Sequence, residues 1–137
     1  MKEINQTHPK STSAYIHIPF CEHICYYCDF NKVFLEGQPV DEYIQSLLTE
    51  IRLTLEKHPT KVSETIYIGG GTPTSLTAKQ LDVLLTGIHR YLPTHTTKEF
   101  TVEANPGDLT AEKFDVFKAH GVNRLSMGVQ TFDDRLL

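Results

Sequence analysis

Three cysteines within eight residues are the part of this sequence whose types and spacing can do chemistry. Residues 21–28 read CEHICYYC, so Cys21, Cys25 and Cys28 follow a C-x3-C-x2-C pattern and account for all the cysteines of the chain. A 4Fe-4S cluster is usually held by four thiolates. Three thiolates at this spacing can hold three corners of the cube, which leaves the fourth iron open to a second molecule that binds through amino and carboxylate groups.

Two other interpretations of the cysteines stay open at this point. A zinc site with three cysteines would take His23 or His17 as its fourth ligand, although zinc ligands more often come as two separated pairs. The thiols would otherwise be buried structural side chains. An odd, clustered set does not fit a disulfide framework. We therefore expect a reducing compartment, the cytoplasm.

Further candidate residues stand where predicted strands end. The segment GGGTP at 69–73 lets the backbone approach a ligand closely, because glycine lacks a Cβ atom, although taken alone it predicts only a tight turn. Glu103 is either a surface residue or an acceptor for both hydroxyls of a ribose. Gln130 follows the fourth strand and can reach the same ligand. Tyr15, six residues before the first cysteine, is either a core residue or a site residue.

Alternating strands and helices must position these residues. Short runs rich in β-branched and aromatic residues predict strands, and apolar residues at 3.6-residue spacing predict helices. The predicted strands are 13–18, 64–68, 99–103 and 124–129, with Leu125 and Met127 in the core. The first predicted helix begins near Asp41 and Glu42 and runs to about Leu55. The second runs from Thr77 to about Leu92, with Thr77 and Gln80 as a capping box. The third runs from about Thr110 to His120, with Gly121 as its C′ residue.

This alternation predicts an α/β fold, a parallel sheet built from right-handed βαβ units with outer helices. Ligands bind such sheets at the carboxyl ends of the strands, where the candidate residues stand. We expect a flexible N-terminal arm at 1–13 and a core domain at 14–137. Because the strand at 124–129 is followed by neither a helix cap nor a return strand, we expect the 137 residues to be part of a longer protein.

Charge and hydropathy exclude two classes of partner. The formal net charge is −4, from 13 basic and 17 acidic residues, and no run of lysines or arginines stands out, so we expect no nucleic-acid binding. The sequence contains no stretch of about 18 apolar residues, so we expect no transmembrane segment.

Four motifs in order resemble the oxygen-independent coproporphyrinogen III oxidase family of radical-SAM proteins. They are YIHIPFCEHICYYCDF (15–30), IYIGGGTPTSL (66–76), FTVEANPGDLT (100–110) and GVNRLSMGVQTF (121–132). The resemblance implies a partial (β/α)6 barrel, of which this chain would hold about four βα units. It also implies a 4Fe-4S cluster with S-adenosylmethionine on the open iron, a pair that performs one-electron cleavage of the sulfonium.

The same resemblance implies roles for single residues, without assigning a catalytic one. Cys21, Cys25 and Cys28 match the cluster ligands, and Glu103 matches the acid that binds the ribose of the cofactor. The other residues that match cofactor contacts or cluster neighbours are Tyr15, Tyr27, Gly70, Gly71, Thr72 and Gln130.

The family resembled has two branches. Its oxidases decarboxylate two propionates of coproporphyrinogen III, and carry a further cysteine in Cys-Gly-Cys and a longer N-terminal extension. This sequence has Cys28-Asp29-Phe30 and 14 residues before Tyr15, and so resembles the other branch, the heme chaperones, which bind heme and pass it to acceptor proteins. The resemblance implies heme or a porphyrinogen as ligand, a flavodoxin or ferredoxin as electron donor, and a heme-acceptor protein as partner.

Overall fold

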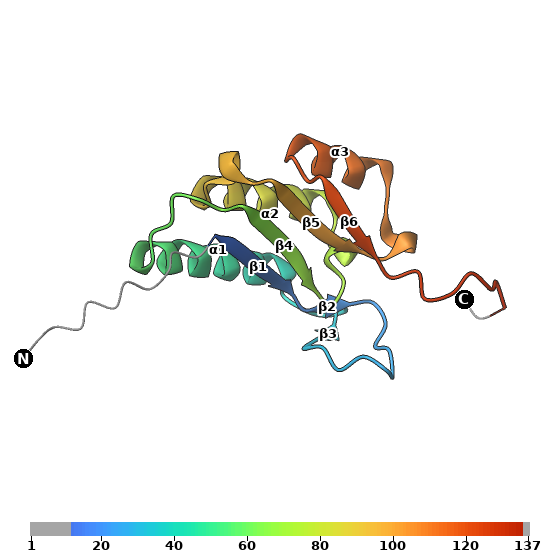
Figure 1. Ribbon diagram of the computed structural model, residues 1–137. Helices are drawn as coiled ribbons and strands as arrows, with labels where there is room; N and C mark the ends of the chain where they lie inside the picture. The colour runs from blue at the N-terminus through green and yellow to red at the C-terminus, as the bar shows by residue number, and fades with distance from the viewer. Residues whose placement is uncertain (1–11, 136–137) are drawn as a thin grey trace, which may run out of the picture.

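Four parallel strands form the central sheet of the computed structural model, which describes residues 12–135. Their order across the sheet is β1 (Ser13–Ile18), β4 (Thr65–Gly70), β5 (Glu99–Ala104) and β6 (Arg124–Met127), as Figure 1 shows. Each strand pairs in parallel with its neighbour in this order. The predicted α/β fold with a parallel sheet is therefore confirmed.

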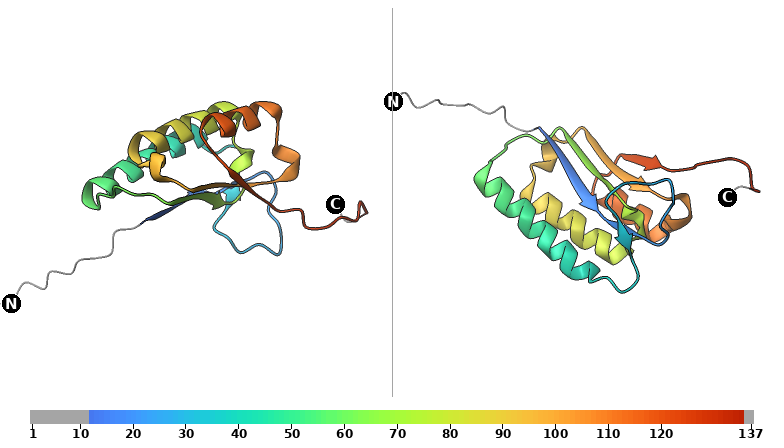
Figure 2. Two further views of the ribbon diagram at one scale, coloured as in Figure 1. Left: turned by 45° about the horizontal axis from the view of Figure 1, so that its top comes forward. Right: turned by 90° about the horizontal axis from the view of Figure 1, so that it is seen from below.

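Three helices connect these strands and lie together on one side of the sheet (Figure 2). They are α1 (Val40–Lys57), α2 (Ala78–Tyr91) and α3 (Ala111–Ala119). The one-turn 3-10 helices are η1 (Pro73–Ser75), η2 (Thr94–Thr96) and η3 (Pro106–Asp108). Within residues 12–135, no helix covers the opposite side of the sheet, which we term the open face.

The period of two along each strand separates the two faces. Ile16 and Ile18 of β1 and the matching apolar residues of β4 and β5 are buried under the helices. The alternate positions carry polar or amphipathic side chains and belong to the open face. They include Tyr15, His17, Tyr67, Thr101 and Glu103. The sheet therefore presents its chemistry-bearing side chains on the face that the helices leave free.

Helix ends agree with the caps that the sequence predicts. At the start of α2, the Gln80 backbone N–H donates to Thr77 Oγ1 (3.2 Å) and the Thr77 N–H donates to Gln80 Oε1 (3.0 Å), which makes a complete capping box. Thr110 caps α3 by accepting from the Lys113 N–H. Gly121, with φ +72°, follows α3 in the left-handed conformation that favours glycine.

Two strand boundaries differ from the prediction. β4 begins at Thr65 and extends to Gly70, because Gly69 and Gly70 still pair with β1. β6 ends at Met127, so Gln130 lies three residues beyond the strand, and its φ is +63°. The prediction that Met127 is a core residue was wrong, since its side chain is 51% exposed, whereas Leu125 packs against the core.

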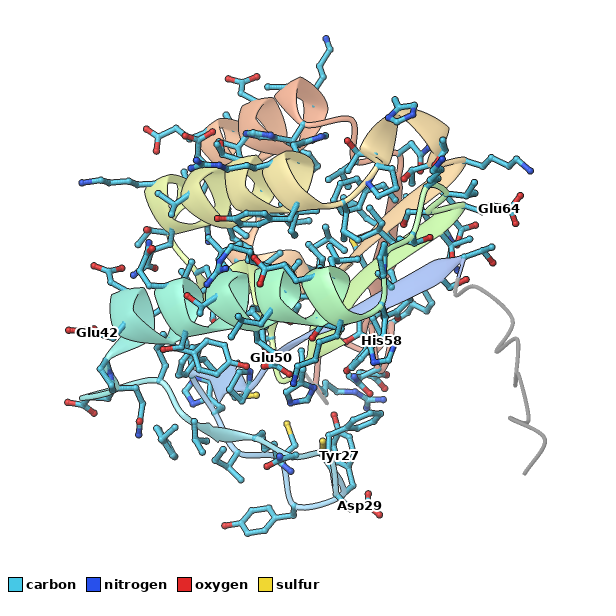
Figure 3. The ribbon with its side chains drawn as sticks, turned by 90° about the vertical axis from the view of Figure 1, so that its left-hand side faces the viewer. Tyr27, Asp29, Glu42, Glu50, His58 and Glu64 are labelled. Atoms are coloured by element: carbon cyan, nitrogen blue, oxygen red, sulfur yellow. The ribbon has the colours of Figure 1, made fainter. Side chains whose placement is uncertain are left out.

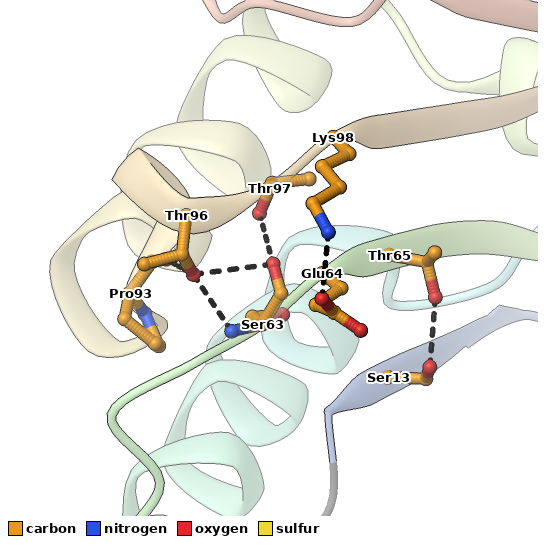
Figure 4. A network of polar contacts seen from close by, with 8 residues as sticks. All are labelled: Ser13, Ser63, Glu64, Thr65, Pro93, Thr96, Thr97 and Lys98. Carbon is orange, nitrogen blue, oxygen red and sulfur yellow. Dashed lines mark hydrogen bonds and ion pairs between the residues drawn. The ribbon is translucent and has the colours of Figure 1, made fainter.

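Polar side chains connect the opposite, amino-terminal ends of the strands, as Figure 4 shows. Lys98 forms an ion pair with Glu64 (2.8 Å), and the Thr97 hydroxyl donates to the Ser63 carbonyl (2.7 Å). The Thr65 hydroxyl donates to Ser13 Oγ between β4 and β1 (2.9 Å). These contacts join the segments before β4 and β5 at the end of the sheet that is remote from the cysteines.

The expected N-terminal arm at 1–13 falls largely outside the described residues, and Ser13 already belongs to β1. Among the described residues, no helix is both long and apolar enough to span a lipid bilayer.

Helices α1 and α2 touch most closely at Gly87. A Cβ atom added there would collide with Cδ2 of Leu48, a buried side chain of α1, and would lie 2.9 Å from its Cγ. Alanine at this position would therefore overpack the interface between the helices.

Gly87→Ala should lower the free energy of unfolding, measured by urea denaturation, by about 1 kcal/mol. Overpacking costs about 1–3 kcal/mol, and the better helix propensity of alanine returns about 1 kcal/mol. Thr86→Ala, at the exposed neighbouring position of α2, is the control and should leave stability unchanged or slightly higher. A Gly87→Ala protein as stable as the Thr86→Ala protein would contradict the close contact.

Candidate cofactor site

The cysteine loop begins and ends in a short two-stranded sheet. β2 (Phe20–Cys21) pairs in parallel with β3 (Val33–Phe34), and the Leu35 N–H donates to the Cys21 carbonyl (2.9 Å). The sequence did not predict this pair, since two-residue strands carry no periodic signal. It closes the loop at its base, so residues 22–32 project from the carboxyl end of the sheet (Figure 1).

The three cysteines have different surroundings. Cys21 is buried at the base of the loop, Cys25 is exposed, and Cys28 is half-buried, and all three are free thiols. The Cys28 N–H donates to the Cys25 carbonyl (3.3 Å), which folds this part of the loop into a turn. Figure 3 shows Tyr27 and Asp29 on the same loop, which extends away from α1.

The loop in this structure does not gather its thiols into a finished ligand set. Among the described residues, no group of three His, Cys, Asp or Glu side chains is close enough to hold a metal ion. The donor set itself fits an iron–sulfur cluster, because three thiols of one loop are free and two of them are accessible. His23, the candidate fourth ligand of a zinc site, is exposed on the same loop.

Two neighbours contact the cysteines. A hydrogen bond with the Cys25 side chain, and next a small desolvation, raise the pKa of the exposed Tyr27 hydroxyl. Thr72 Oγ1 lies 3.6 Å from Cys21 Sγ and donates to it. The structure thus brings together the predicted residues Thr72 and Cys21, which are 51 positions apart in the sequence.

The glycine segment is joined to the start of the cysteine loop by its backbone. The Gly71 N–H donates to the Ile18 carbonyl and the Thr72 N–H to the Phe20 carbonyl, both at 2.8 Å. A Cβ atom on Gly71 would lie 2.7 Å from the Phe20 carbonyl oxygen. Glycine is required here by the close approach of two backbones, a reason that the sequence alone did not reveal.

Glu103 is held by two donors on the open face. Its Oε1 accepts from the Tyr67 hydroxyl (2.6 Å), and its Oε2 accepts from the Gly70 N–H (3.0 Å). Gly70 has φ +121°, a conformation that other residues rarely adopt. Two predicted residues, Glu103 and Gly70, are therefore in direct contact, and Tyr67 joins them as a residue that the sequence motifs did not single out.

Tyr15 lies on the same open face, next to Tyr67. Its ring stacks on that of Tyr67, with centroids 6.1 Å apart, and its hydroxyl is 3.0 Å from His17 Nδ1. The side chain is 58% exposed, so the alternative of a core residue was wrong. Burial of part of the ring, and then the charge of Glu103, raise the pKa of its hydroxyl.

His17 connects this group of side chains to the cysteine loop. Its Nε2 lies 2.8 Å from the carbonyl oxygen of Asn31 and donates to it, while Nδ1 accepts from the Tyr15 hydroxyl. The strand period of two, which puts His17 on the same face of β1 as Tyr15, is the sequence signal that could have found His17. The register between β1 and β4, which only the structure shows, aligns Tyr67 with Tyr15.

Gln130 takes a different place from the one predicted at a strand end. It is exposed, and its Nε2 lies 2.9 Å from the position that a Cβ atom on Gly128 would occupy. The side chain therefore lies against the turn after β6, where β6 pairs with β5 and its Glu103.

Comparisons with known proteins follow the same motifs. Residues 15–137 match the radical SAM superfamily. This chain belongs to the radical SAM superfamily. Membership implies a 4Fe-4S cluster and S-adenosylmethionine.

Relatives of this chain carry two names. It is 60% identical over 126 residues to the heme chaperone HemW of Bacillus subtilis (strain 168). The matched segment covers 91% of this chain and 33% of that relative. The heme chaperone HemW of Escherichia coli (strain K12) is 43% identical, with 91% and 33% covered. The oxygen-independent coproporphyrinogen III oxidase of Salmonella typhimurium is 37% identical over 122 residues, with 88% and 27% covered.

A solved structure agrees with the fold. The coproporphyrinogen III oxidase HemN of Escherichia coli, described as a radical SAM enzyme, superposes with a TM-score of 0.75 at 30% identity, over 90% of this chain and 29% of that chain. The chain therefore spans about a third of the length of the relatives that it matches. The expected radical SAM fold with a parallel sheet and outer helices is confirmed over this part.

Cys25→Ala should abolish assembly of the cluster, because two remaining thiols leave two irons without a protein ligand. The contents of iron and acid-labile sulfide, measured after anaerobic reconstitution, should fall from about four of each per chain to a small remaining fraction. His23→Ala, an exposed change in the same loop, is the matched control and should keep the full iron and sulfide content. One zinc and no sulfide in the unaltered protein would refute the cluster.

Proposed function

We propose that this chain is the cofactor-binding part of a heme chaperone, with residues 14–137 as its radical SAM core domain. The observation that carries the proposal is the 60% identity, over 91% of this chain, to a protein named as a heme chaperone. Asp29 and Phe30, in place of a Gly-Cys pair after Cys28, support the same branch.

Cys21, Cys25 and Cys28 would hold the cluster in this proposal, and S-adenosylmethionine would occupy the open iron. Cys21 is anchored by β2 and by Thr72, whereas Cys25 and Cys28 lie on the projecting loop. We infer that binding of the cluster draws these two thiols toward Cys21. The Tyr27 hydroxyl can donate a hydrogen bond to the Cys25 sulfur.

The remaining predicted residues would bind the cofactor around this loop. The N–H groups of Gly70, Gly71 and Thr72 already donate within the protein. An amino group that binds iron still carries two N–H donors, so the carbonyl oxygens of this segment suit the amino group of S-adenosylmethionine. Glu103 would accept hydrogen bonds from the ribose, and Tyr15 and Gln130 would contact the cofactor from the ends of the open face.

When bound, the cluster and S-adenosylmethionine supply one-electron cleavage of the sulfonium. The residues of this chain contribute orientation rather than a proton at the reacting atoms. Glu103 fixes the ribose, the glycine segment fixes the amino group, and the loop at 22–32 covers the cluster. In a chaperone the same cofactors would regulate heme transfer.

Exposed aromatic side chains on the cysteine loop and on β3 suit a flat apolar ligand. The exposed fractions of the Tyr26, Phe30 and Phe34 side chains are 109%, 64% and 51%. Exposed large apolar side chains are candidates for contact with a ligand when they lie together. Heme would lie against these side chains, with a flavodoxin or ferredoxin as the electron donor and a heme-acceptor protein as the recipient.

The cytoplasm, where thiols stay reduced, suits the free cysteines.

A porphyrinogen-decarboxylating oxidase is the second candidate. The structural match to the Escherichia coli oxidase and the 37% identity to the Salmonella typhimurium oxidase favour it. The cofactor site alone does not separate the two functions, because both would use the same cluster and the same open face.

Titration of the full-length protein with heme should give a saturable absorbance change at a stoichiometry near one. An anaerobic assay with coproporphyrinogen III, S-adenosylmethionine and a reductant should release no carbon dioxide above background, because the proposed role is transport. Robust decarboxylation would refute the chaperone in favour of the oxidase. Absence of heme binding together with absence of decarboxylation would refute both candidates.

Glu103→Gln should weaken S-adenosylmethionine binding roughly tenfold, because hydrogen bonds to a charged acceptor contribute more than those to a neutral amide. Anaerobic titration calorimetry measures the dissociation constant, and iron and sulfide content should be unchanged. Glu99→Gln, an exposed glutamate of the same strand at the far end of the sheet, is the control. If the Glu103→Gln protein binds S-adenosylmethionine as tightly as the unaltered protein, Glu103 is not part of the site.

A further inference from the structure

Tyr67 occupies the centre of the open face. It is the third residue of β4, and its backbone is aligned with Tyr15 on β1 and with Thr101 on β5. Its hydroxyl donates to Glu103 Oε1 over 2.6 Å, the short distance typical of a hydrogen bond to a charged acceptor.

The Glu103 carboxylate is oriented by two different donors. Tyr67 holds Oε1, and the Gly70 backbone N–H holds Oε2 at 3.0 Å. A carboxylate offers about four acceptor positions, two on each oxygen. One position on each oxygen is therefore still available, and two positions match the two neighbouring hydroxyls of a ribose.

We propose that Tyr67 is a positioning residue for the cofactor: its hydroxyl fixes the rotation of the Glu103 carboxylate so that one free acceptor position of each oxygen faces the ribose. The proposal rests on the function proposed above, in which Glu103 binds the ribose of S-adenosylmethionine. Without the Tyr67 hydroxyl, the Gly70 N–H alone would hold the carboxylate, which could then turn about that single hydrogen bond.

The absence of a side chain at Gly69 makes room for this contact. A Cβ atom on Gly69 would lie 2.7 Å from Tyr67 Cε1 and 2.8 Å from Glu103 Oε2. These atoms belong to the ends of two side chains, so alanine would displace the pair rather than the backbone. Gly69 is therefore required by the Tyr67–Glu103 contact.

The Tyr67 hydroxyl carries its proton at neutral pH. Burial, and then the hydrogen bond to Glu103, raise the pKa of Tyr67, although Ser126 and Arg124 act in the opposite direction. Since the ordinary tyrosine pKa is about 10, the hydroxyl stays a donor through the neutral range and is lost as a donor only as pH rises above that value. The stacked ring of Tyr15 covers one side of Tyr67.

Tyr67→Phe keeps the ring and removes only the hydroxyl, and it is the test of the proposal. The dissociation constant of S-adenosylmethionine, measured anaerobically by calorimetry on the reconstituted full-length protein, should rise roughly five- to tenfold. Iron and sulfide content should not change. The dissociation constant of free methionine, which has no ribose, should also stay the same, and this readout separates positioning of Glu103 from a general structural role.

Tyr43→Phe is the matched control. The Tyr43 hydroxyl donates to the His17 carbonyl (2.7 Å) from α1, on the helix side of the sheet, so its loss removes a comparable hydrogen bond without touching Glu103. S-adenosylmethionine affinity should be unchanged in this variant. Equal weakening by Tyr67→Phe and Tyr43→Phe would overturn the proposal and assign Tyr67 to the stability of the fold.

A double-mutant cycle with Glu103→Ala completes the test. If Tyr67 acts through Glu103, adding Tyr67→Phe to Glu103→Ala should weaken binding no further. Additive losses, or wild-type affinity in Tyr67→Phe alone, would overturn the proposal while leaving the proposed function intact. An unaltered protein that assembles no cluster or binds no S-adenosylmethionine would instead overturn the proposed function, and the positioning role with it.

Discussion

The contact between the backbone of the glycine segment and the end of β1 is the constraint on which the site depends. Gly71 and Thr72 donate to Ile18 and Phe20, and the approach is so close that a Cβ atom on Gly71 would collide with the Phe20 carbonyl. This contact brings the end of β4 against the start of the cysteine loop. Because Thr72 lies beside Cys21 and the neighbouring Gly70 donates to Glu103, the cysteine loop and Glu103 are both attached to the same short segment.

The division of the sheet into two faces explains how one domain combines stability with chemistry. Apolar residues of alternate positions pack under α1, α2 and α3 and form the core. The positions between them carry Tyr15, His17, Tyr67 and Glu103, which hydrogen bond with one another or stack on the open face. Since strand side chains alternate strictly, burial of one face is what brings the polar residues of separate strands together on the other.

Heme transport and porphyrinogen decarboxylation would both use this architecture. Relatives named as heme chaperones and relatives named as coproporphyrinogen oxidases both match nearly the whole chain. A cofactor site is reused with different purposes when the substrate is bound elsewhere. In the proposed function, the residues that contact the tetrapyrrole would separate transport from decarboxylation, and the exposed Tyr26, Phe30 and Phe34 are the candidates in this chain.

The sequence by itself determined the features whose signals are local. Cysteine spacing indicated the cluster, a period of two or 3.6 indicated the strands and helices, and Thr77, Gln80 and Gly121 marked helix ends that the structure confirms. The parallel sheet also followed from the alternation of elements, and the structure then gave the order of its four strands.

Only the tertiary structure decided which distant residues meet. Tyr67 stands 36 positions from Glu103, and their contact depends on the register between β4 and β5 and on the space left by Gly69. The structure also placed Gln130 beyond β6 with a positive φ and left Met127, the last residue of β6, exposed. Register, side-chain direction and exposure are properties of packed elements, so a pattern read along one strand cannot specify them.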